Sequence, residues 1–255
     1  MDPAVRSPLI DFFRRGDVAR DVRLLAARGA FAPSALDQLA LLLILLGDSD
    51  PEVARESAAT IDRLPREPLE AFLARPDVTN EIREFFAARD ILPGGAPLEG
   101  DVALLDESEP APAAQEGEDE KTTAQRLNMM GVMEKVKVAT RGTREERSIL
   151  VRDPNRMVAA AVLSSPKLTD QEVEGFAKMA NVTDEVLRVI GANRQWTKRY
   201  GVVAGLVRNP KTPVAISMNL LQRINDKDIR LIALDRNVPE PVRIAARKRV
   251  SETRL

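Results

Sequence analysis

Apolar residues recur at helical spacing through both ends of the chain. Residues 9–13 carry one apolar face, and residues 35–46 are apolar nearly all round. A helix that is apolar on every side belongs in the middle of a core, whereas an amphipathic helix buries a single stripe. Asp50 followed by Pro51 predicts a helix start, because aspartate caps helix N-termini and proline is tolerated at the first position. The pattern predicts about six helices in residues 1–91, with residues 35–46 as the central one.

The second half shows the same helical spacing. Two capping boxes, Thr143 with Glu146 and Thr169 with Glu172, mark helix starts, since each side chain can bond the other residue's main-chain N–H. Helices are expected near residues 123–139, 143–152, 155–164, 170–179, 183–191, 196–207, 213–223, 226–234 and 240–250. Nothing alternates with the period of a strand over a useful length. The predicted fold class is therefore all-α.

A block that begins with Asp-Pro or Asn-Pro and ends in Val-Thr or Val-Pro recurs three times. The copies run over residues 50–79, 153–183 and 209–239, and the distance from the proline to the valine is nearly the same in each. The last two copies begin at Asp153 and Asn209, which defines a 56-residue period, and they align without a gap over most of their length. Self-similarity at a fixed period is typical of stacked repeats, in which each unit buries its apolar face against its neighbours.

The alignment of the blocks makes predictions about burial. Val158 and Val214 should be buried alike, and so should Phe176 and Ile232. The Asp or Asn that opens each later block should cap a helix as Asp50 does.

The signature of the last block is Asn209-Pro210, Val214, Leu220-Leu221, Asp226, Ile229, Ile232-Ala233, Asn237-Val238-Pro239 and Val242-Arg243. This pattern resembles α-helical solenoid repeats of the HEAT, armadillo and leucine-rich-variant kind. The resemblance covers residues 143–255 well and 35–90 less well. It implies a curved stack that offers a concave surface to partners, and it implies no reaction. The 56-residue period exceeds the usual 40–47 residues, so three helices, or one and a half helix pairs, are expected in each unit.

Residues 92–122 differ in composition from both ends of the chain. Pro, Gly, Ala and Glu predominate, and residues 99–120 carry nine acidic side chains and no basic one. Such a sequence cannot bury enough apolar surface to offset the entropy of ordering, so a disordered acidic linker without packed structure is predicted. It would join an N-terminal helical module over residues 1–91 to a C-terminal module over residues 123–255. Residues 102–105, Val-Ala-Leu-Leu, interrupt it and are either solvated filler or a docking motif.

Charge is divided unevenly along the chain. Residues 1–120 carry 12 Arg and 25 acidic side chains, a net charge of −13, whereas residues 121–255 carry a net charge of +12. The total of −1 therefore conceals a strongly dipolar chain, which implies contact with an anionic partner, internal or external.

The residue types that are missing restrict the chemistry. The chain contains no cysteine, which excludes disulfides and thiolate sites, and no histidine, the commonest general base and zinc ligand. No glycine-rich phosphate loop and no calcium loop occurs. We therefore expect no catalytic residues, no cofactor and no metal. The N-terminal residues do not resemble a signal peptide, and the longest apolar stretch, eight residues from Leu39, is shorter than the roughly 20 of a membrane span. A cytoplasmic location without a membrane span is expected.

The segment from Asn193 to Tyr200 is the most suggestive local sequence, because it holds the only Trp and the only Tyr among three basic residues. The candidate partner-binding residues are Arg194, Trp196, Lys198, Arg199, Tyr200 and Arg208. The cluster could be a protein-binding hot spot or could stack on a nucleic-acid base. The alternative is that both aromatic rings, four residues apart on a helix, pack into the core. Arg152, Arg208 and Arg236 either form an anion-binding stripe or bond the carbonyls at their helix C-termini.

These observations favour a non-enzymatic helical-repeat scaffold that binds another protein or its own acidic linker. The alternative is a nucleic-acid-binding repeat protein that uses the basic residues 121–255. A DNA-repair-type enzyme is a third interpretation, because some DNA glycosylases resemble HEAT stacks, although no carboxylate is securely placed beside a Trp. Residues 99–120 could also fold back and mask the basic surface, or could only keep the chain soluble. The sequence indicates neither the partner nor the oligomeric state.

Overall fold

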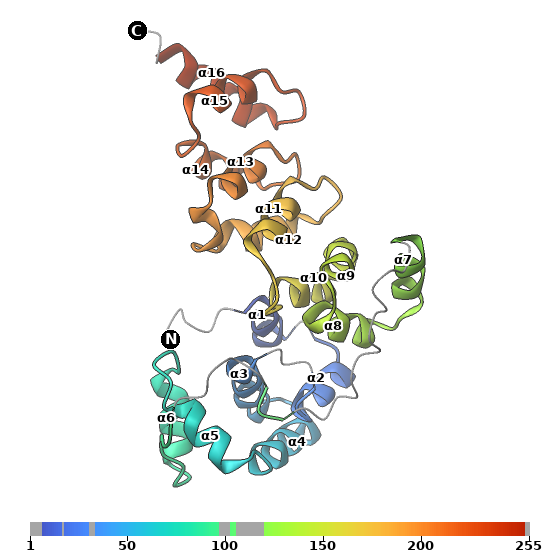
Figure 1. The fold of residues 1–255 in the computed structure, drawn as a ribbon, viewed down its shortest axis with the longest axis vertical. Helices are drawn as coiled ribbons and strands as arrows, with labels where there is room; N and C mark the ends of the chain where they lie inside the picture. The colour runs from blue at the N-terminus through green and yellow to red at the C-terminus, as the bar shows by residue number, and fades with distance from the viewer. Residues whose placement is uncertain (1–6, 17, 31–33, 97–102, 106–119, 253–255) are drawn as a thin grey trace. The chain divides into compact units, whose positions relative to one another are not determined.

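The computed structural model describes residues 7–16, 18–30, 34–96, 103–105 and 120–252. These residues form α-helices and a 3-10 helix with no strand among them, which confirms the all-α class (Figure 1). The chain divides into two compact units. Unit 1 contains Met1–Thr143 and Ala161–Lys167, and unit 2 contains Arg144–Ala160 and Leu168–Leu255. The division lies at residue 143, so two helices that follow the acidic segment belong to unit 1.

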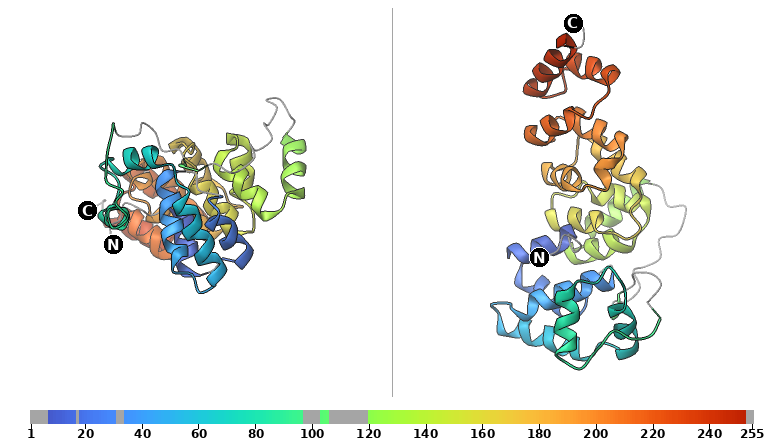
Figure 2. Two further views of the ribbon diagram at one scale, coloured as in Figure 1. Left: turned by 90° about the horizontal axis from the view of Figure 1, so that it is seen from below. Right: turned by 90° about the vertical axis from the view of Figure 1, so that its left-hand side faces the viewer.

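Unit 1 is built around helix α3, which α1, α2 and α4 contact directly (Figures 1 and 2). Its helices are α1 (Pro8–Arg15), α2 (Arg20–Ala27), α3 (Ala35–Leu46), α4 (Pro51–Asp62), α5 (Arg66–Leu73), α6 (Asn80–Ala87), α7 (Glu120–Met129) and α8 (Val132–Arg141). Leu39 and Leu42 of α3 are completely buried, and Phe72 and Phe86 complete the same apolar cluster. The prediction that residues 35–46 form the central helix is confirmed.

Local sequence signals explain where these helices begin. The Ser34 hydroxyl accepts a hydrogen bond from the Asp37 N–H at 3.0 Å and caps α3. The Asp50 carboxylate accepts one from the Glu52 N–H at 2.9 Å, and Pro51 takes the first position of α4, as predicted. One prediction fails: the helix expected over residues 123–139 is two helices, because Gly131 is extended and separates α7 from α8.

Part of the acidic segment is packed against unit 1. Leu104 and Leu105 lie against the apolar cluster, and their main-chain groups are hydrogen-bonded to the side chain of Gln38. The expectation of a segment without packed structure is therefore wrong for residues 103–105, where two consecutive leucines supply apolar surface that the rest of the segment lacks. Residues 97–102 and 106–119 lie outside the described residues.

Unit 2 consists of successive helical hairpins (Figure 1). Its helices are α9 (Arg144–Leu150), α10 (Arg156–Leu163, whose last three residues belong to unit 1), α11 (Asp170–Lys178), α12 (Asp184–Ala192), the 3-10 helix η2 (Trp196–Lys198), α13 (Tyr200–Arg208), α14 (Val214–Leu221), α15 (Asp226–Leu234) and α16 (Glu240–Glu252). In each of the last three hairpins a nine-residue helix is followed by a five-residue loop and a second helix. The first helices of these hairpins begin at Asp170, Tyr200 and Asp226, so the first spacing is longer than the second.

The 56-residue period therefore spans two hairpins, which together contain four helices. The expectation of three helices, or one and a half pairs, in each 56-residue unit is wrong. The sequence period hides the hairpin because the two spacings differ, and η2 occupies part of the longer connection. The structural unit is the helical hairpin.

The hairpin register explains which burial predictions hold. Phe176 and Ile232 are both buried, as predicted, and Leu206 occupies the equivalent position of α13. Val158 is completely buried, however, whereas Val214 is 40% exposed. The gapless alignment is wrong at that position.

Pro213 explains why Val214 is exposed although Val158 is buried. A residue before proline is disfavoured in the α region, so Thr212 cannot join the helix and α14 begins only at Val214. In the earlier block the helix begins two residues sooner, at Arg156. Since each residue turns a helix by about 100°, a delay of two residues rotates Val214 out of the core.

The opening Asp and Asn of the later blocks do not cap helices as Asp50 does. Asp153 accepts a hydrogen bond from the Asn155 N–H at 2.8 Å, and Asn155 in turn accepts one from Met157. Asn209 is buried, and its amide donates to the carbonyls of Ala177 and Met179 at 2.9 and 2.8 Å. Asn209 thus joins one hairpin to the end of α11 in the hairpin before it.

Candidate partner-binding surface

The two aromatic residues of the predicted cluster do not share one helix. Trp196 is the first residue of η2 and is half-buried, whereas Tyr200 is the first residue of α13 and is 42% exposed. The Asn193 side chain accepts hydrogen bonds from the N–H groups of Gln195 and Trp196 and forms the turn before η2. The helix expected over residues 196–207 is divided, because Arg199 is extended between η2 and α13. The alternative in which both rings pack into the core on one helix is therefore wrong.

Tyr200 and Arg208 meet at one carboxylate of the next hairpin. The Tyr200 hydroxyl donates to Asp228 Oδ2, and Arg208 Nη2 lies 2.5 Å from Asp228 Oδ1. Burial raises the pKa of Tyr200, and its bond to Asp228 raises it further. The same hydrogen bond lowers the pKa of Asp228, and the charge of Arg208 adds to that effect. This contact joins α13 to α15 through side chains.

The three other basic residues of the cluster differ in what their side chains contact. Arg199 forms an ion pair with Asp170, and Lys198 Nζ donates to Gln195 Oε1 at 2.9 Å. Arg194 is exposed. The structure therefore does not bring the six predicted residues together as one open cationic surface, because Arg199 and Arg208 both contact carboxylates.

The three arginines of the predicted anion-binding stripe also differ in what their side chains contact. Arg152 Nε donates to the Ser148 carbonyl at 2.8 Å, near the C-terminus of α9, which agrees with the helix-end alternative. Arg208 contacts Asp228, and Arg236 is exposed in the loop between α15 and α16. These three arginines do not share one environment.

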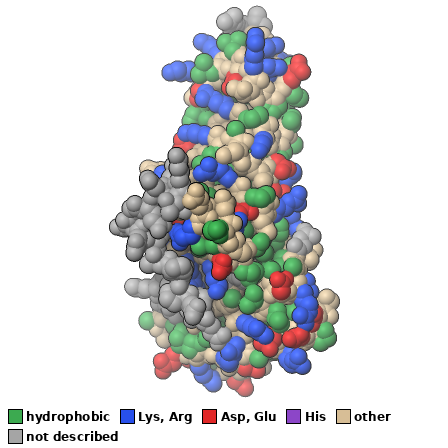
Figure 3. All heavy atoms as spheres, turned by 90° about the vertical axis from the view of Figure 1, so that its right-hand side faces the viewer, with side chains coloured by type: hydrophobic (Ala, Val, Ile, Leu, Met, Phe, Trp, Pro, Cys, Tyr) green, Lys and Arg blue, Asp and Glu red, His purple; other side chains and the backbone are tan. Residues whose placement is uncertain are grey.

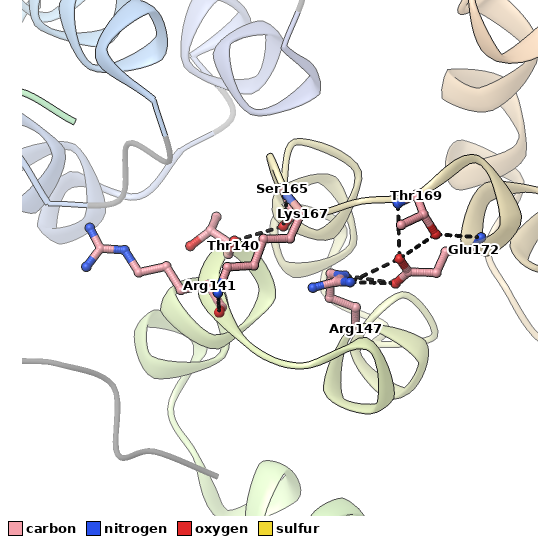
Figure 4. Close-up of polar contacts among 7 residues, drawn as sticks. All are labelled: Thr140, Arg141, Arg147, Ser165, Lys167, Thr169 and Glu172. Atoms are coloured by element: carbon pink, nitrogen blue, oxygen red, sulfur yellow. Dashed lines mark hydrogen bonds and ion pairs between the residues drawn. The ribbon is translucent and has the colours of Figure 1, made fainter. Parts of the chain in front are cut away.

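Sequence reasoning missed a buried ion pair between the first two hairpins of unit 2. Arg147 Nε and Nη2 donate to the two carboxylate oxygens of Glu172 at 2.9 and 3.0 Å, and both side chains are almost completely buried (Figure 4). Glu172 also accepts from the Thr169 N–H at 3.0 Å, which confirms that capping box. The signal was available: Arg147 follows Thr143 as Val173 follows Thr169, so an arginine occupies an apolar position of the hairpin.

Figure 4 also shows two contacts within unit 1. The Ser165 hydroxyl donates to the Thr140 carbonyl at 2.8 Å, and Lys167 Nζ donates to the Arg141 carbonyl at 2.9 Å. Both acceptors lie at the C-terminal end of α8, where carbonyls have no partner within the helix. These contacts satisfy the end of α8 and suggest no chemistry.

The last hairpin presents large apolar side chains to solvent. Leu231 and Leu234 of α15 are 52% and 78% exposed, and Ile244 of α16 is 56% exposed. Lys227 and Arg230 are also exposed on α15, and each lies one helical turn before one of the two leucines. The space-filling view shows basic side chains gathered over this C-terminal part of unit 2 (Figure 3). The sequence signal for the surface is the pair of leucines that alternate with the buried Ile229 and Ile232.

The position of α13 that is equivalent to Leu231 is covered by α11. Gly205 occupies the position of α13 that Leu231 occupies in α15, and a Cβ at Gly205 would lie 3.1 Å from Lys178 Cγ and 3.2 Å from Ala177 Cβ. The absence of a side chain thus lets α13 approach α11 closely. On α15, Asp228 contacts α13 through its side chain, and Leu231 and Leu234 are exposed.

The described residues hold no group of three or more acidic side chains placed to bind a metal ion. Within that part of the chain, no helix combines the length and apolar character needed to cross a bilayer. Comparison of the chain with known protein families, curated proteins and solved structures finds no match.

Proposed function

We propose that this protein is a non-enzymatic helical-repeat scaffold, resembling HEAT, armadillo and leucine-rich-variant repeats, that binds another protein through the last hairpin of unit 2. The observation that carries the proposal is the outward face of α15. Exposed single apolar residues are ordinary on protein surfaces, but neighbouring large ones favour an interaction site. Here two leucines lie three residues apart on one helix face, and Leu231 occupies the position at which Gly205 of α13 approaches α11.

The charges around the leucines favour an acidic partner. Lys227, Arg230 and Arg236 are exposed on or beside α15, and complementary charge guides association and suppresses wrong partners. The favoured partner is therefore a protein segment that presents apolar side chains flanked by Asp or Glu. Binding would bury Leu231 and Leu234 while the cations remain at a hydrated rim.

The proposal can be tested with displayed random peptides selected on the intact protein. Selection should enrich peptides that combine Leu, Ile or Phe with Asp or Glu. The selected peptides should then bind Leu234→Asp at least about tenfold more weakly, because a tenfold change corresponds to about 1.4 kcal/mol and burying a leucine contributes about that much or more.

Leu92→Asp is the matched control, because Leu92 is a 62% exposed leucine of unit 1. It should leave peptide binding unchanged. Equal loss of binding in both variants, or selected peptides without apolar and acidic residues, would contradict the proposal. Circular dichroism should show the same helix content for both variants, since each site is exposed.

Nucleic-acid binding by the basic half is the second candidate, and the net charge of +12 over residues 121–255 supports it. The ion pairs of Arg199 and Arg208 count against it, because cations already satisfied by carboxylates contribute less to phosphate binding. A salt titration separates the candidates. Affinity for single-stranded or duplex DNA that falls steeply with salt, and does not change in Leu234→Asp, would favour nucleic acid.

A further inference from the structure

Gln38 is a buried polar side chain at the centre of unit 1. It lies on α3 and is only 1% exposed. Its Nε2 donates to the Gly29 carbonyl at 3.2 Å and to the Leu105 carbonyl at 2.7 Å. Its Oε1 accepts from the N–H groups of Leu104 and Leu105 at 2.8 and 3.0 Å. A glutamine amide has two donor hydrogens and two acceptor lone pairs, so the hydrogen-bonding capacity of Gln38 is filled.

Three of these four hydrogen bonds go to the main chain of Leu104 and Leu105. Main-chain bonds of this kind can hold a peptide whatever its side chains, and neighbouring apolar contacts then select the sequence. Without the segment, Gln38 would keep only its bond to Gly29, and a buried amide without partners is costly. The hydrogen bonds of Gln38 are therefore complete only when a peptide segment occupies the site.

The surroundings of Gln38 select apolar side chains. Leu104 and Leu105 are half-buried against the apolar cluster that contains Leu39 and Leu42. Gly29 shapes the floor, since its φ of +90° is a conformation that glycine adopts easily. A Cβ at Gly29 would lie 3.6 Å from Gln38 Nε2 and 3.9 Å from Leu105 Cβ, which are ordinary contact distances, so the positive φ and not a lack of space favours glycine there.

We propose that the Gln38 site is a peptide-binding site for a Leu-Leu segment, that the chain's own Leu104-Leu105 occupies it, and that a Leu-Leu segment of a partner protein can displace this internal ligand. Every hydrogen bond from the site to the segment uses main-chain groups, which any chain could supply. The leucines are only half-buried, so the internal ligand holds the site without being built into the core. This site is in unit 1 and does not depend on the function proposed for α15.

The Leu104-Leu105 segment is covalently part of the chain, and this determines how well a free peptide can compete with it for the site. A tethered ligand acts at an effective concentration of the order of millimolar, so a free peptide should bind weakly to the intact protein. Removing the leucines from the chain should open the site. The probe is a fluorescent synthetic peptide with the sequence of residues 101–108, Asp-Val-Ala-Leu-Leu-Asp-Glu-Ser.

We expect the peptide to bind the variant Leu104→Ser/Leu105→Ser at least about tenfold more tightly than the unchanged protein, measured by fluorescence anisotropy. Adding Gln38→Met should weaken that binding by about tenfold or more, because the loss of the hydrogen bonds leaves peptide groups without partners. A control peptide with serines in place of both leucines should not bind. A folded double-serine variant that binds the peptide no better than the unchanged protein would overturn the proposal.

A second measurement decides the matter if the double-serine variant does not fold. The chain has no cysteine, so Ala103→Cys can carry a single fluorophore next to the internal ligand. Excess unlabelled peptide should lower the anisotropy of this label as Leu104-Leu105 leaves the site, while a label at Ala88→Cys should not respond. Unchanged anisotropy of the label in the Ala103→Cys variant, with the peptide well above millimolar concentration, would contradict displacement. Selection of α15-binding peptides is unaffected by either result, so the two proposals can fail separately.

Discussion

The two units bury their apolar residues in different ways. In unit 1 an apolar cluster forms around α3 and draws residues from several helices, including the large rings of Phe72 and Phe86. In unit 2 the same pattern of buried positions repeats in successive hairpins. Val173, Val203 and Ile229 are all buried, and each is the fourth residue of the first helix of its hairpin. A shared cluster couples distant residues, whereas a hairpin contacts mainly its neighbours. A core substitution should therefore destabilise most of unit 1, whereas in unit 2 it should destabilise mainly the hairpin that carries it and the neighbouring hairpins.

Their buried polar groups differ as well. Unit 1 buries the neutral amide of Gln38, which bonds main-chain groups of a separate segment. Unit 2 buries the charges of Arg147 and Glu172, which satisfy each other between neighbouring hairpins. The first arrangement suits a ligand that can be exchanged, and the second suits a permanent joint, because separating two buried charges is far more costly.

The largest expected effect is the loss of that joint. Arg147→Ala should lower the free energy of unfolding by about 3–5 kcal/mol, since it leaves the Glu172 carboxylate buried without its partner. Urea denaturation followed by circular dichroism measures the change. Arg194→Ala removes an exposed arginine and should change stability by less than about 0.5 kcal/mol.

The double variant Arg147→Met/Glu172→Gln sharpens this test. Glutamine can keep the capping bond at Thr169, and methionine supplies the apolar volume found at Val173. Replacing a buried ion pair by neutral groups of similar size is often nearly neutral, so most of the stability should return. A double variant as unstable as Arg147→Ala would show that the pair is not the source of the loss.

Core truncation directly tests the difference between the units. Leu42→Ala in unit 1 and Ile232→Ala in unit 2 remove completely buried side chains, and each should cost about 2–5 kcal/mol. Hydrogen exchange should be faster throughout α1–α6 in the first variant, but mainly in α13–α16 in the second. Leu231→Ala, at the exposed neighbouring position, should cost less than about 0.5 kcal/mol. Equally widespread exchange in both core variants would remove the distinction.

A smaller effect is expected at Asn209, which joins two hairpins through its side chain. Asn209→Ala leaves the carbonyls of Ala177 and Met179 without this donor, and an unsatisfied buried group costs about 1–3 kcal/mol. The loss should appear in urea denaturation, with faster hydrogen exchange at the end of α11. Asn193→Ala is the comparison, because its bonds are confined to the exposed turn before η2.

Helical periodicity was enough to predict the all-α class, the central helix and the burial of Phe176 and Ile232, because these depend on local spacing. It was not enough to predict the hairpin unit, since Pro213 delays one helix start and the apparent period covers two unequal hairpins. The contacts of Arg208, Arg147 and Gln38 depend on groups that lie several helical turns or whole helices away along the chain. The sequence can mark one member of such a pair, as it does for the arginine at an apolar position of the hairpin, but a single sequence does not identify the distant partner.

The smallest expected effect concerns the contact of Tyr200 with Asp228. The folded pKa of Asp228 is lowered from its ordinary 3.8, so its contribution to stability is present above about that pH and is lost as the pH falls through the lower folded value. The pKa of Tyr200 is raised from 10.0, so its contribution is present below that pH and is lost as the pH rises through the higher folded value. Because Tyr200 is well exposed, Tyr200→Phe should cost no more than about 1 kcal/mol at neutral pH. The difference between the two proteins should shrink in acid below the folded pKa of Asp228 and in alkali above that of Tyr200, as measured by urea denaturation at each pH. A difference that stays constant across the whole range would mean that the hydroxyl does not act through this hydrogen bond, and that α13 and α15 are held together mainly by Arg208.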